Sequence, residues 1–296
     1  MGKAYIGISG WTYAGWRGTF YPPGLAHRRE LEFASRRFNA IEINGTFYRL
    51  QRPENFEHWR EQTPGGFRFA VKGSRFITHM KQLREIRAPL ANFLASGVLL
   101  LEAKLGPILW QFAPRRRLDL ERFGAFLELL PRSTADASRL ARRHDARVSG
   151  RAAYAVERSR PLRHAIEIRH ESFLTDEFLA LLRRHRCALV FSDAASGWPY
   201  SEDVTAGFVY LRLHGAEETY ASGYGDDALD RWAARLQAWL AGSEPADAAR
   251  TGPPPPRRSR RDAYIFFDND AKVRAPFDAL ALARRLGNDW SERHEQ

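Results

Sequence analysis

The stretch Phe208-Val209-Tyr210-Leu211-Arg212-Leu213-His214 alternates between polar or aromatic residues and leucine from position 210 onward. Successive side chains of a β-strand point to opposite faces, so Tyr210, Arg212 and His214 share one face. The leucines on the other face suit packing against helices, which leaves the polar face to point toward the interior of a closed sheet. The stretch therefore predicts a strand that brings charged groups together at its C-terminal end.

Seven further runs have the β-branched or aromatic character of short strands and are bounded by turn residues. They are predicted at residues 5–9, 40–44, 67–72, 108–112, 165–169, 188–192 and 264–268. Helical periodicity lies between most of them, including helices near 85–95 and 275–286, but no clear helix follows the sixth strand. Eight such alternations predict an α/β fold of the (β/α)8 TIM-barrel type rather than a doubly wound sheet.

One domain over residues 1–290 is predicted, followed by a tail at 291–296. Two insertions interrupt the strand–helix alternation. Residues 132–161 are polar and rich in Arg, and residues 242–262 hold a Pro- and Arg-rich run that is expected not to pack and to form a flexible loop. Each insertion precedes a strand, so we expect both at the N-terminal face, away from the rim where barrel enzymes build their sites.

The composition excludes several classes of protein. A hydrophobic content of 44% with 12% aromatic residues excludes a wholly disordered chain. No apolar run approaches the roughly 20 residues of a membrane span, and the N-terminus does not resemble a signal peptide. The single Cys187 excludes an internal disulfide framework. The expected location is the cytoplasm.

The net charge of +11 makes nucleic acid an alternative partner. Only five of the 46 basic residues are Lys, however, and many Arg residues occur in pairs on predicted helix faces. A codon bias toward Arg and a solvated helix surface explain such a pattern without any anionic partner.

Polar residues break the apolar character of several strands near their C-terminal ends. Glu42 and Asn44 share one face of the second strand, and Glu167 and Arg169 share one face of the fifth. Single polar residues end the other strands, at Lys72, Gln111, Asp193 and Asp268. Burial of so many ionisable groups costs several kcal/mol each unless they are paired or functional, so either a closed ion-pair network or a ligand site is expected. The position at the rim favours a ligand site.

The candidate catalytic residues are Glu42 and Glu167, as general acid and base, together with His214. The inward cations Lys72, Arg169 and Arg212 suit a small anionic ligand. Rim aromatic residues suit stacking on a sugar ring or a base. The remaining candidate ligand-binding residues are Trp11, Tyr13, Asn44, Tyr48, His79, Gln111, His170 and Asp193.

No metal site or cofactor is predicted. Carboxylates at the strand ends and His214 offer metal ligands in principle, so a divalent metal remains an alternative. No strand contributes two strong ligands, however, and the inward cations would repel a divalent ion. The sequence also contains no dinucleotide-binding, P-loop or nucleophile-elbow motif.

Ordered motifs along the chain carry a family resemblance. They include Ile6-Gly7-Ile8-Ser9-Gly10-Trp11-Thr12-Tyr13, Glu42-Ile43-Asn44-Gly45-Thr46-Phe47-Tyr48-Arg49, Leu105-Gly106-Pro107-Ile108-Leu109-Trp110-Gln111, Glu167-Ile168-Arg169-His170 and Tyr210-Leu211-Arg212-Leu213-His214-Gly215. In these motifs the chain resembles the YecE-like family of domain-of-unknown-function proteins. The resemblance implies a TIM barrel and no established activity.

The chain departs from that family pattern near two strand ends. His170-Glu171-Ser172-Phe173 stands where the family usually has His-Pro-Ser-Trp, and Asp268-Asn269-Asp270 stands where two asparagines are typical. Asp278 also replaces a common asparagine. These departures leave Asp268 outside the set of candidate site residues.

Three functional hypotheses follow. The first is a metal-independent hydrolase, lyase or isomerase that acts on an anionic sugar-like or phosphorylated substrate at the C-terminal rim. The second is a metal-dependent nucleic-acid enzyme resembling the endonuclease IV-type barrels. The third is a non-catalytic carbohydrate or nucleotide binder. Nothing in the sequence indicates an oligomeric state.

Overall fold

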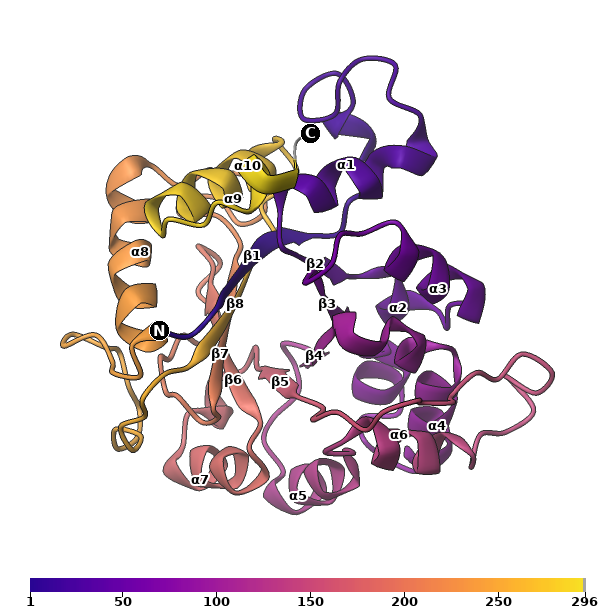
Figure 1. Cartoon of the computed structure of the whole chain (residues 1–296). Coiled ribbons are helices and arrows are strands. Elements are labelled where there is room, and N and C mark those ends of the chain that lie inside the picture. The colour runs from indigo at the N-terminus through magenta and orange to yellow at the C-terminus, as the bar shows by residue number, and fades with distance from the viewer. Residues whose placement is uncertain (295–296) are drawn as a thin grey trace.

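Eight parallel strands close into a barrel in the computed structural model, which describes residues 1–294 (Figure 1). The strands are β1 (Ala4–Ser9), β2 (Ala40–Ile43), β3 (Arg68–Lys72), β4 (Leu105–Gln111), β5 (His164–Glu167), β6 (Ala188–Asp193), β7 (Phe208–Leu213) and β8 (Asp262–Phe267). β1 pairs with both β2 and β8, which closes the sheet. The predicted TIM barrel is confirmed.

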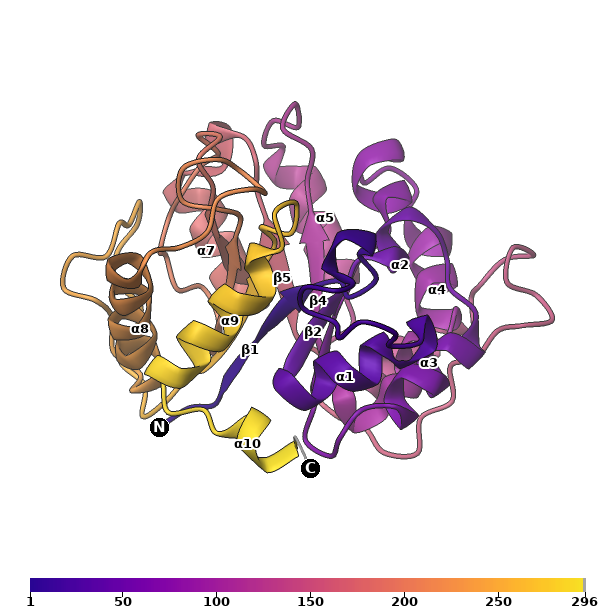
Figure 2. The same ribbon diagram turned by 90° about the horizontal axis from the view of Figure 1, so that it is seen from above.

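Helices surround the barrel and alternate with its strands (Figures 1 and 2). They are α1 (Glu30–Arg37), α3 (Pro53–Glu61), α4 (Arg87–Ala95), α5 (Leu120–Leu129), α6 (Thr134–Ala141), α7 (Asp176–His185), α8 (Asp226–Leu240) and α9 (Arg274–Arg285), with the short α2 (Gly45–Tyr48) and α10 (Trp290–His294). Single 3-10 turns lie at Ala14–Trp16, His27–Arg29 and Glu171–Phe173, a longer one at Val98–Lys104, and a π-helix at Phe76–Met80. No helix within residues 1–294 is long and apolar enough to cross a membrane.

The strand β4 begins three residues earlier than predicted. Gly106 and Pro107 are typical of loops, but here they belong to the strand. A Cβ at Gly106 would lie 2.9 Å from the carbonyl oxygen of Phe69, so glycine permits the close approach of β3. The pairing register shifts between Phe69 and Val71, which accommodates this irregular start.

An extended segment replaces a helix between β6 and β7, as the sequence predicted. Thr205 fixes this segment to the start of β6, because its hydroxyl accepts a hydrogen bond from Leu189 N (2.8 Å) and donates one to Cys187 O (2.7 Å). The buried Glu202 accepts hydrogen bonds from Arg235 of α8 and from the backbone N of Ala249, each at 2.9 Å. The segment is therefore held against the start of β6 and against α8.

The Pro- and Arg-rich insertion contacts this extended segment. The buried carboxylate of Asp203 accepts hydrogen bonds from the backbone N of Thr251 (2.7 Å) and of Gly252 (3.2 Å). Arg261, at the end of the insertion, is buried and donates to Ser243 O and Pro256 O. The prediction that this run does not pack is therefore wrong at both of its ends.

The described part of the predicted tail at 291–296 belongs to the helix α10, which spans Trp290–His294. Trp290 is buried, its indole donates to Ser35 O at 2.9 Å, and its ring stacks on His294. Residues 295 and 296 lie outside the described residues. The indole anchors this helix beside α1.

The inward side chains divide the barrel interior into two layers. The lower layer, toward the N-terminal ends of the strands, is an apolar and aromatic cluster separate from the core between strands and helices. It comprises Tyr5, Ala40, Ala70, Leu109, Ala165, Ala188, Val190, Ala206, Phe208, Tyr210, Tyr264 and Phe266. Two residues further along seven strands, the inward side chain becomes polar. This upper layer comprises Glu42, Lys72, Gln111, Glu167, Ser192, Arg212 and Asp268, all buried, together with Ser9 of β1.

Candidate functional site at the C-terminal mouth of the barrel

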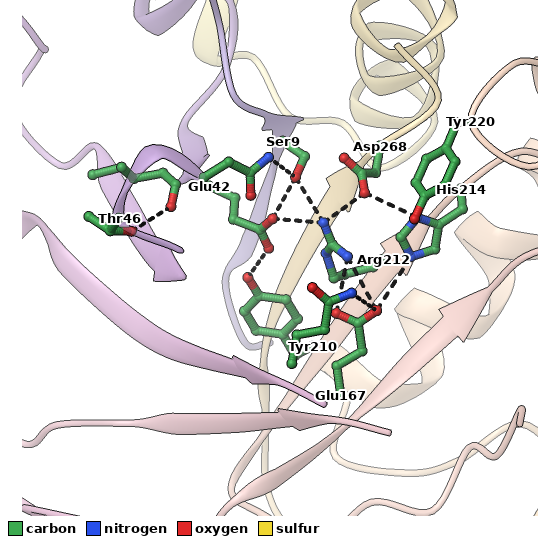
Figure 3. A network of polar contacts seen from close by, with 12 residues as sticks. Ser9, Glu42, Thr46, Glu167, Tyr210, Arg212, His214, Tyr220 and Asp268 are labelled. Atoms are coloured by element: carbon green, nitrogen blue, oxygen red, sulfur yellow. Dashed lines mark hydrogen bonds and ion pairs between the residues drawn. The ribbon is translucent and has the colours of Figure 1, made fainter. Parts of the chain in front are cut away.

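Arg212 of β7 occupies the centre of the upper layer and is fully buried (Figure 3). Its Nη2 donates to Asp268 Oδ2 at 2.7 Å, Glu42 Oε1 at 3.0 Å and Ser9 Oγ at 3.1 Å. Its Nη1 donates to Glu167 Oε2 at 3.0 Å. One guanidinium group therefore joins residues from four other strands or strand ends.

Two of the carboxylates around Arg212, those of Glu167 and Asp268, are held in the ionised form. Burial disfavours the charge of Glu167, but Arg212 and Arg169 outweigh burial and lower its pKa to about 2. Burial also opposes the ionisation of Asp268, yet Arg212 and His214 hold the pKa of this carboxyl below its usual range. Both groups are therefore anions at neutral pH.

The carboxyl of Glu42 lies deepest in this network. Its Oε1 accepts from Ser9 Oγ at 2.5 Å as well as from Arg212, and its Oε2 accepts from the Tyr210 hydroxyl at 2.6 Å. Both oxygens therefore have strong donors, and the side chain has no exposed surface. Asn44 extends this network outward, because its amide donates to Ser9 Oγ at 3.1 Å.

Two further cations balance the charge of the carboxylates and lie at the open edge of the network. Arg169 donates to Glu167 Oε1 at 2.9 Å and stacks on the ring of Trp198 at 3.6 Å. The Lys72 ammonium lies 4.6 Å from the centre of the Phe47 ring and has no hydrogen-bond acceptor among residues 1–294. Burial, and next Arg212, lower the pKa of Lys72.

His214 lies between two carboxylates. Its Nδ1 is 3.1 Å from Asp268 Oδ2, and its Nε2 is 3.9 Å from Glu167 Oε1. Burial lowers the pKa of His214, so the imidazole is neutral at pH 7 despite its anionic neighbours. The rings of Trp198 and Tyr220 meet it edge-on, with centroids 5.0 and 5.3 Å away. The imidazole is thus a buried, neutral group beside a fixed carboxylate.

A cavity of about 590 Å³ opens beside this network, above the ends of β1 and β2. The four predicted ligand-binding residues of these two strand ends line it, namely Trp11, Tyr13, Asn44 and Tyr48. Polar side chains complete the wall, including Gln51, Asn55, His58 and Gln62. Such a volume fits a small organic ligand, and the mixture of rings and amides suits a sugar.

The structure brings most of the predicted residues together. Gln111 lies in the upper layer, with its amide 3.4 Å from Glu167 Oε1. His79 lies at the edge, where its ring meets Phe47 edge-on; burial lowers its pKa, and Lys72 and Arg169 lower it further. The other members of the network or its cavity are Glu42, Glu167, His214, Trp11, Tyr13, Asn44, Tyr48, Lys72, Arg169 and Arg212.

Two predicted residues lie apart from the network. The inward residue of β6 is Ser192, two positions after Val190, so Asp193 has the opposite parity. Asp193 instead accepts a hydrogen bond from the Tyr224 hydroxyl at 3.0 Å. His170 accepts from the backbone N of Ser172 at 3.1 Å and caps the following 3-10 turn. The prediction that Asp193 points into the barrel is wrong.

Four residues of the site were not among the predicted ones: Ser9, Trp198, Tyr220 and Asp268. Asp268 is recognised in the sequence as the polar end of its strand but is left out of the candidate residues because it departs from the family pattern; it has the inward parity of Phe266. Trp198 and Tyr220 lie in loops, where no periodicity indicates their direction. Among residues 1–294, no group of three or more His, Cys, Asp or Glu side chains is placed to hold a metal ion.

The family model described as "Protein of unknown function DUF72" matches residues 5–296. The chain belongs to the DUF72 family. Its predicted resemblance to YecE-like proteins is thereby confirmed. This DUF72 protein is 34% identical over 122 residues to the "UPF0759 protein YecE" of Escherichia coli and 33% identical over 115 residues to the "UPF0759 protein YunF" of Bacillus subtilis.

These curated relatives are matched only in part. The aligned segments cover 36% and 37% of this chain and 42% and 40% of the lengths of YecE and YunF, respectively. Solved structures cover more of the DUF72 chain. A DUF72 family protein of Thermotoga maritima has a TM-score of 0.72 and 23% identity, covering 96% of this chain and 99% of that one.

A DUF72 family protein of Enterococcus faecalis has a TM-score of 0.67 and 17% identity, covering 96% of this chain and 95% of its own. At these identities the two structures support the shared barrel fold and no more. The chemistry of the site has to be argued from its own side chains.

Proposed function

We propose that this DUF72 protein is an enzyme that transfers a proton to or from a small anionic, sugar-like substrate at the C-terminal mouth of the barrel. The observation that carries the proposal is the neutral imidazole of His214, whose Nδ1 lies 3.1 Å from Asp268 Oδ2. A carboxylate on one side of an imidazole orients the ring and stabilises the imidazolium that forms when the other nitrogen accepts a proton.

Arg212 supports this role by fixing Asp268. The 2.7 Å hydrogen bond from Arg212 Nη2 holds the carboxylate in one orientation and keeps it ionised. Because Arg212 is itself held by Glu42 and Glu167, the three residues form a rigid support beneath the imidazole. We therefore assign Glu42 and Glu167 to positioning rather than to the acid and base roles predicted from the sequence.

Lys72 and Arg169 are the groups suited to an anionic part of the substrate. Arg212 forms ion pairs with three carboxylates, whereas the Lys72 ammonium has no hydrogen-bond acceptor among residues 1–294. Arg169 donates through Nε and Nη2 to Glu167, which leaves Nη1 available. An anion between these two cations would lie at the edge of the network, on the side where Gln111 and His79 add neutral hydrogen-bonding groups.

Access to the imidazole depends on the two aromatic rings that cover it. Trp198 and Tyr220 lie in the loops after β6 and β7 and close over His214, which is fully buried. Substrate entry requires these rings to move, and their return would exclude water from the site. The large cavity beside Asn44 supplies room for the rest of a sugar-like molecule.

Hydrogen–deuterium exchange tests the proposal without knowledge of the product. The protein is incubated in D2O with a panel of sugar phosphates and sugar acids, and loss of carbon-bound protons is followed by NMR. We expect exchange with at least one compound, and the change His214→Gln should slow it by about 10²- to 10⁴-fold because the proton acceptor is lost.

The change His170→Gln is the matched control, because this histidine lies at the same rim but caps a local turn. We expect it to alter the exchange rate by less than about threefold. Exchange that survives in the His214→Gln variant would refute the assignment of the proton acceptor. Tight retention of a panel compound with no exchange would favour the binding protein among the sequence hypotheses.

A further inference from the structure

A second cavity, of about 340 Å³, lies on the other side of the mouth. The loop between β4 and α5 forms one wall and projects beyond the strand ends (Figure 2). This loop carries three consecutive arginines, Arg115, Arg116 and Arg117. The residues that line the cavity are Thr78, His79, Gln82, Ala113, Arg115, Arg116, Arg117, Leu118 and Asp119.

The positive charge of this cavity is not neutralised. Within residues 1–294, none of the three arginines forms an ion pair with a carboxylate. The one carboxylate in the lining, Asp119, accepts the backbone N–H of Arg122 at the start of α5 and lies 3.4 Å from the Arg122 guanidinium. Asp119 therefore caps the helix and forms no ion pair with the arginine loop, although its charge also acts on Arg116.

Arg116 is the member of the loop whose guanidinium is partly withdrawn from water. Its Nε and Nη2 are buried and have no hydrogen-bond partner among residues 1–294. A buried charged donor without an acceptor is less favourable than a neutral one in the same position. Burial, and next the like charge of Arg122, lower the pKa of Arg116. No acceptor within the described residues satisfies these two donors, so an anion from outside the protein could do so.

We propose that this cavity binds a phosphate group carried by a small molecule. Nε and one terminal nitrogen of a guanidinium can donate together to two oxygens of a phosphate, and these are the two atoms that Arg116 leaves unpaired. Three arginines around one cavity match a doubly charged phosphate better than a singly charged carboxylate. Thr78, His79 and Gln82 add neutral hydrogen-bonding groups for the remaining oxygens.

The site is separate from the imidazole and carboxylates of the proposed catalytic centre. His79 touches both regions, because its ring lines the cavity and also meets Phe47, on which the Lys72 ammonium lies. The inference does not rest on catalysis, since binding alone is measured.

Calorimetric titration of the full chain with inorganic phosphate and with glucose 6-phosphate tests the inference. We expect one saturable site per chain in both titrations. Arg116→Gln should weaken binding at least tenfold, and Arg116→Lys should weaken it clearly as well, because lysine keeps the charge but cannot donate through two aligned N–H groups. Absence of saturable binding to the wild type would overturn the proposal.

Arg143→Gln is the matched control. Arg143 is exposed after α6 and its side chain forms no ion pair within residues 1–294, so this variant removes the same charge away from the cavity. We expect its affinity to stay within twofold of the wild type. Equal weakening by Arg116→Gln and Arg143→Gln would show that only the net charge of the protein attracts phosphate, and would overturn the inference.

A single-stranded oligonucleotide distinguishes a small molecule from a nucleic-acid backbone. We expect it not to displace glucose 6-phosphate at 0.15 M salt. Displacement with a steep dependence on salt concentration, as the release of many counterions produces, would overturn the small-molecule assignment in favour of nucleic acid.

Discussion

The two layers of the barrel interior are built on the same strands, two residues apart, yet they are held together by different forces. The lower layer consists of alanines, aromatic rings and aliphatic groups, whereas the upper layer consists of charges. Ala40 and Glu42 illustrate the step on β2, and Ala165 and Glu167 illustrate it on β5. Both layers are almost completely buried, so burial alone does not distinguish them.

The comparison shows that the need for stability explains the residues of the lower layer but not those of the upper layer. Apolar burial stabilises the lower layer by about 25 cal/mol per Å² of surface removed from water. In the upper layer the attraction between Arg212 and its carboxylates is offset by the cost of removing their charges from water. Well-packed apolar groups would serve stability as well there, so the upper layer is better explained by chemistry at the mouth.

The N-terminal mouth provides an internal reference for the charged layer. Tyr5 and Tyr264 stack there with ring centroids 4.7 Å apart, and Arg163 pairs with Asp262 at 2.9 Å. The side chains of Arg163 and Asp262 are 37% and 27% exposed, whereas those of Arg212 and Glu167 are 0% exposed. An Arg–carboxylate ion pair therefore occurs at both ends of the barrel. The Arg163–Asp262 pair is partly solvent-exposed (the wet pair), and the Arg212–Glu167 pair is buried (the dry pair).

The largest effect is expected when the dry pair is broken. Arg212→Met leaves three buried carboxylates without their central cation, and we expect a loss of about 3–5 kcal/mol in the free energy of unfolding. Arg163→Gln breaks the wet pair and should cost less than about 1 kcal/mol. Urea denaturation of both variants at pH 7 measures the contrast. Equal losses would mean that water reaches Arg212 as freely as Arg163.

Acid should weaken the upper layer through Glu167. Its pKa in the folded protein is about 2, below the ordinary value of 4.5, so the unfolded chain binds the proton more readily. The resulting stabilisation, on the order of 3 kcal/mol, is complete above pH 4.5 and is lost as the pH falls toward 2. Unfolding free energies measured between pH 5 and pH 2 should therefore fall more steeply for the wild type than for Glu167→Gln.

A buried histidine limits the pH range in which the slope of unfolding free energy against pH can be assigned to Glu167. His164 is fully buried, and burial lowers its pKa from 6.5 to about 4, so it also reduces stability as the pH falls through that range. The contribution of Glu167 is therefore compared below pH 4, where His164 no longer contributes. Parallel slopes for the wild type and the variant below pH 4 would contradict the depressed pKa of Glu167.

The smallest of the three effects concerns two tyrosines that lie on neighbouring strands. Tyr210→Phe removes the hydroxyl that donates to the buried Glu42 at 2.6 Å, and we expect a cost of about 1–3 kcal/mol. Tyr264→Phe removes a hydroxyl that only accepts from the half-exposed Arg163, and should cost less than about 0.5 kcal/mol. Thermal unfolding of the two variants gives the comparison. A larger loss of stability in Tyr264→Phe than in Tyr210→Phe would contradict the expectation that the hydroxyl of the buried upper layer matters more.

Period-two alternation predicted the barrel and much of the site. It placed Glu42 with Asn44, Arg212 with His214, and Glu167 with Arg169, all toward the interior, because the pattern of a strand fixes the direction of its side chains. The same rule misplaced Asp193, since the end of β6 was judged without counting back to Val190. Alternation assigns a side chain to the correct face of a strand only when it is counted from a residue whose face is known.

Pairing within the site could not be predicted from single strands. The partners of Arg212 come from positions up to 203 residues apart in sequence, and nothing local indicates that Ser9 is one of them. The prediction of Glu42 and Glu167 as acid and base was made without the hydrogen bonds that Arg212 and its neighbours donate to their oxygens. Their role depends on dehydration and mutual distance, which only the closed barrel determines.

The position of Arg212 on the seventh of eight strands has a consequence for synthesis of the chain. A ribosome adds Ser9, Glu42 and Glu167 before it adds the residue that joins them, and Asp268 comes last. The first five strands therefore carry Glu42 and Glu167 before the central cation that joins them exists, and a dry interior at that stage is unfavourable. The nascent polypeptide must keep these groups hydrated until its final quarter emerges, so the barrel completes its interior late in translation.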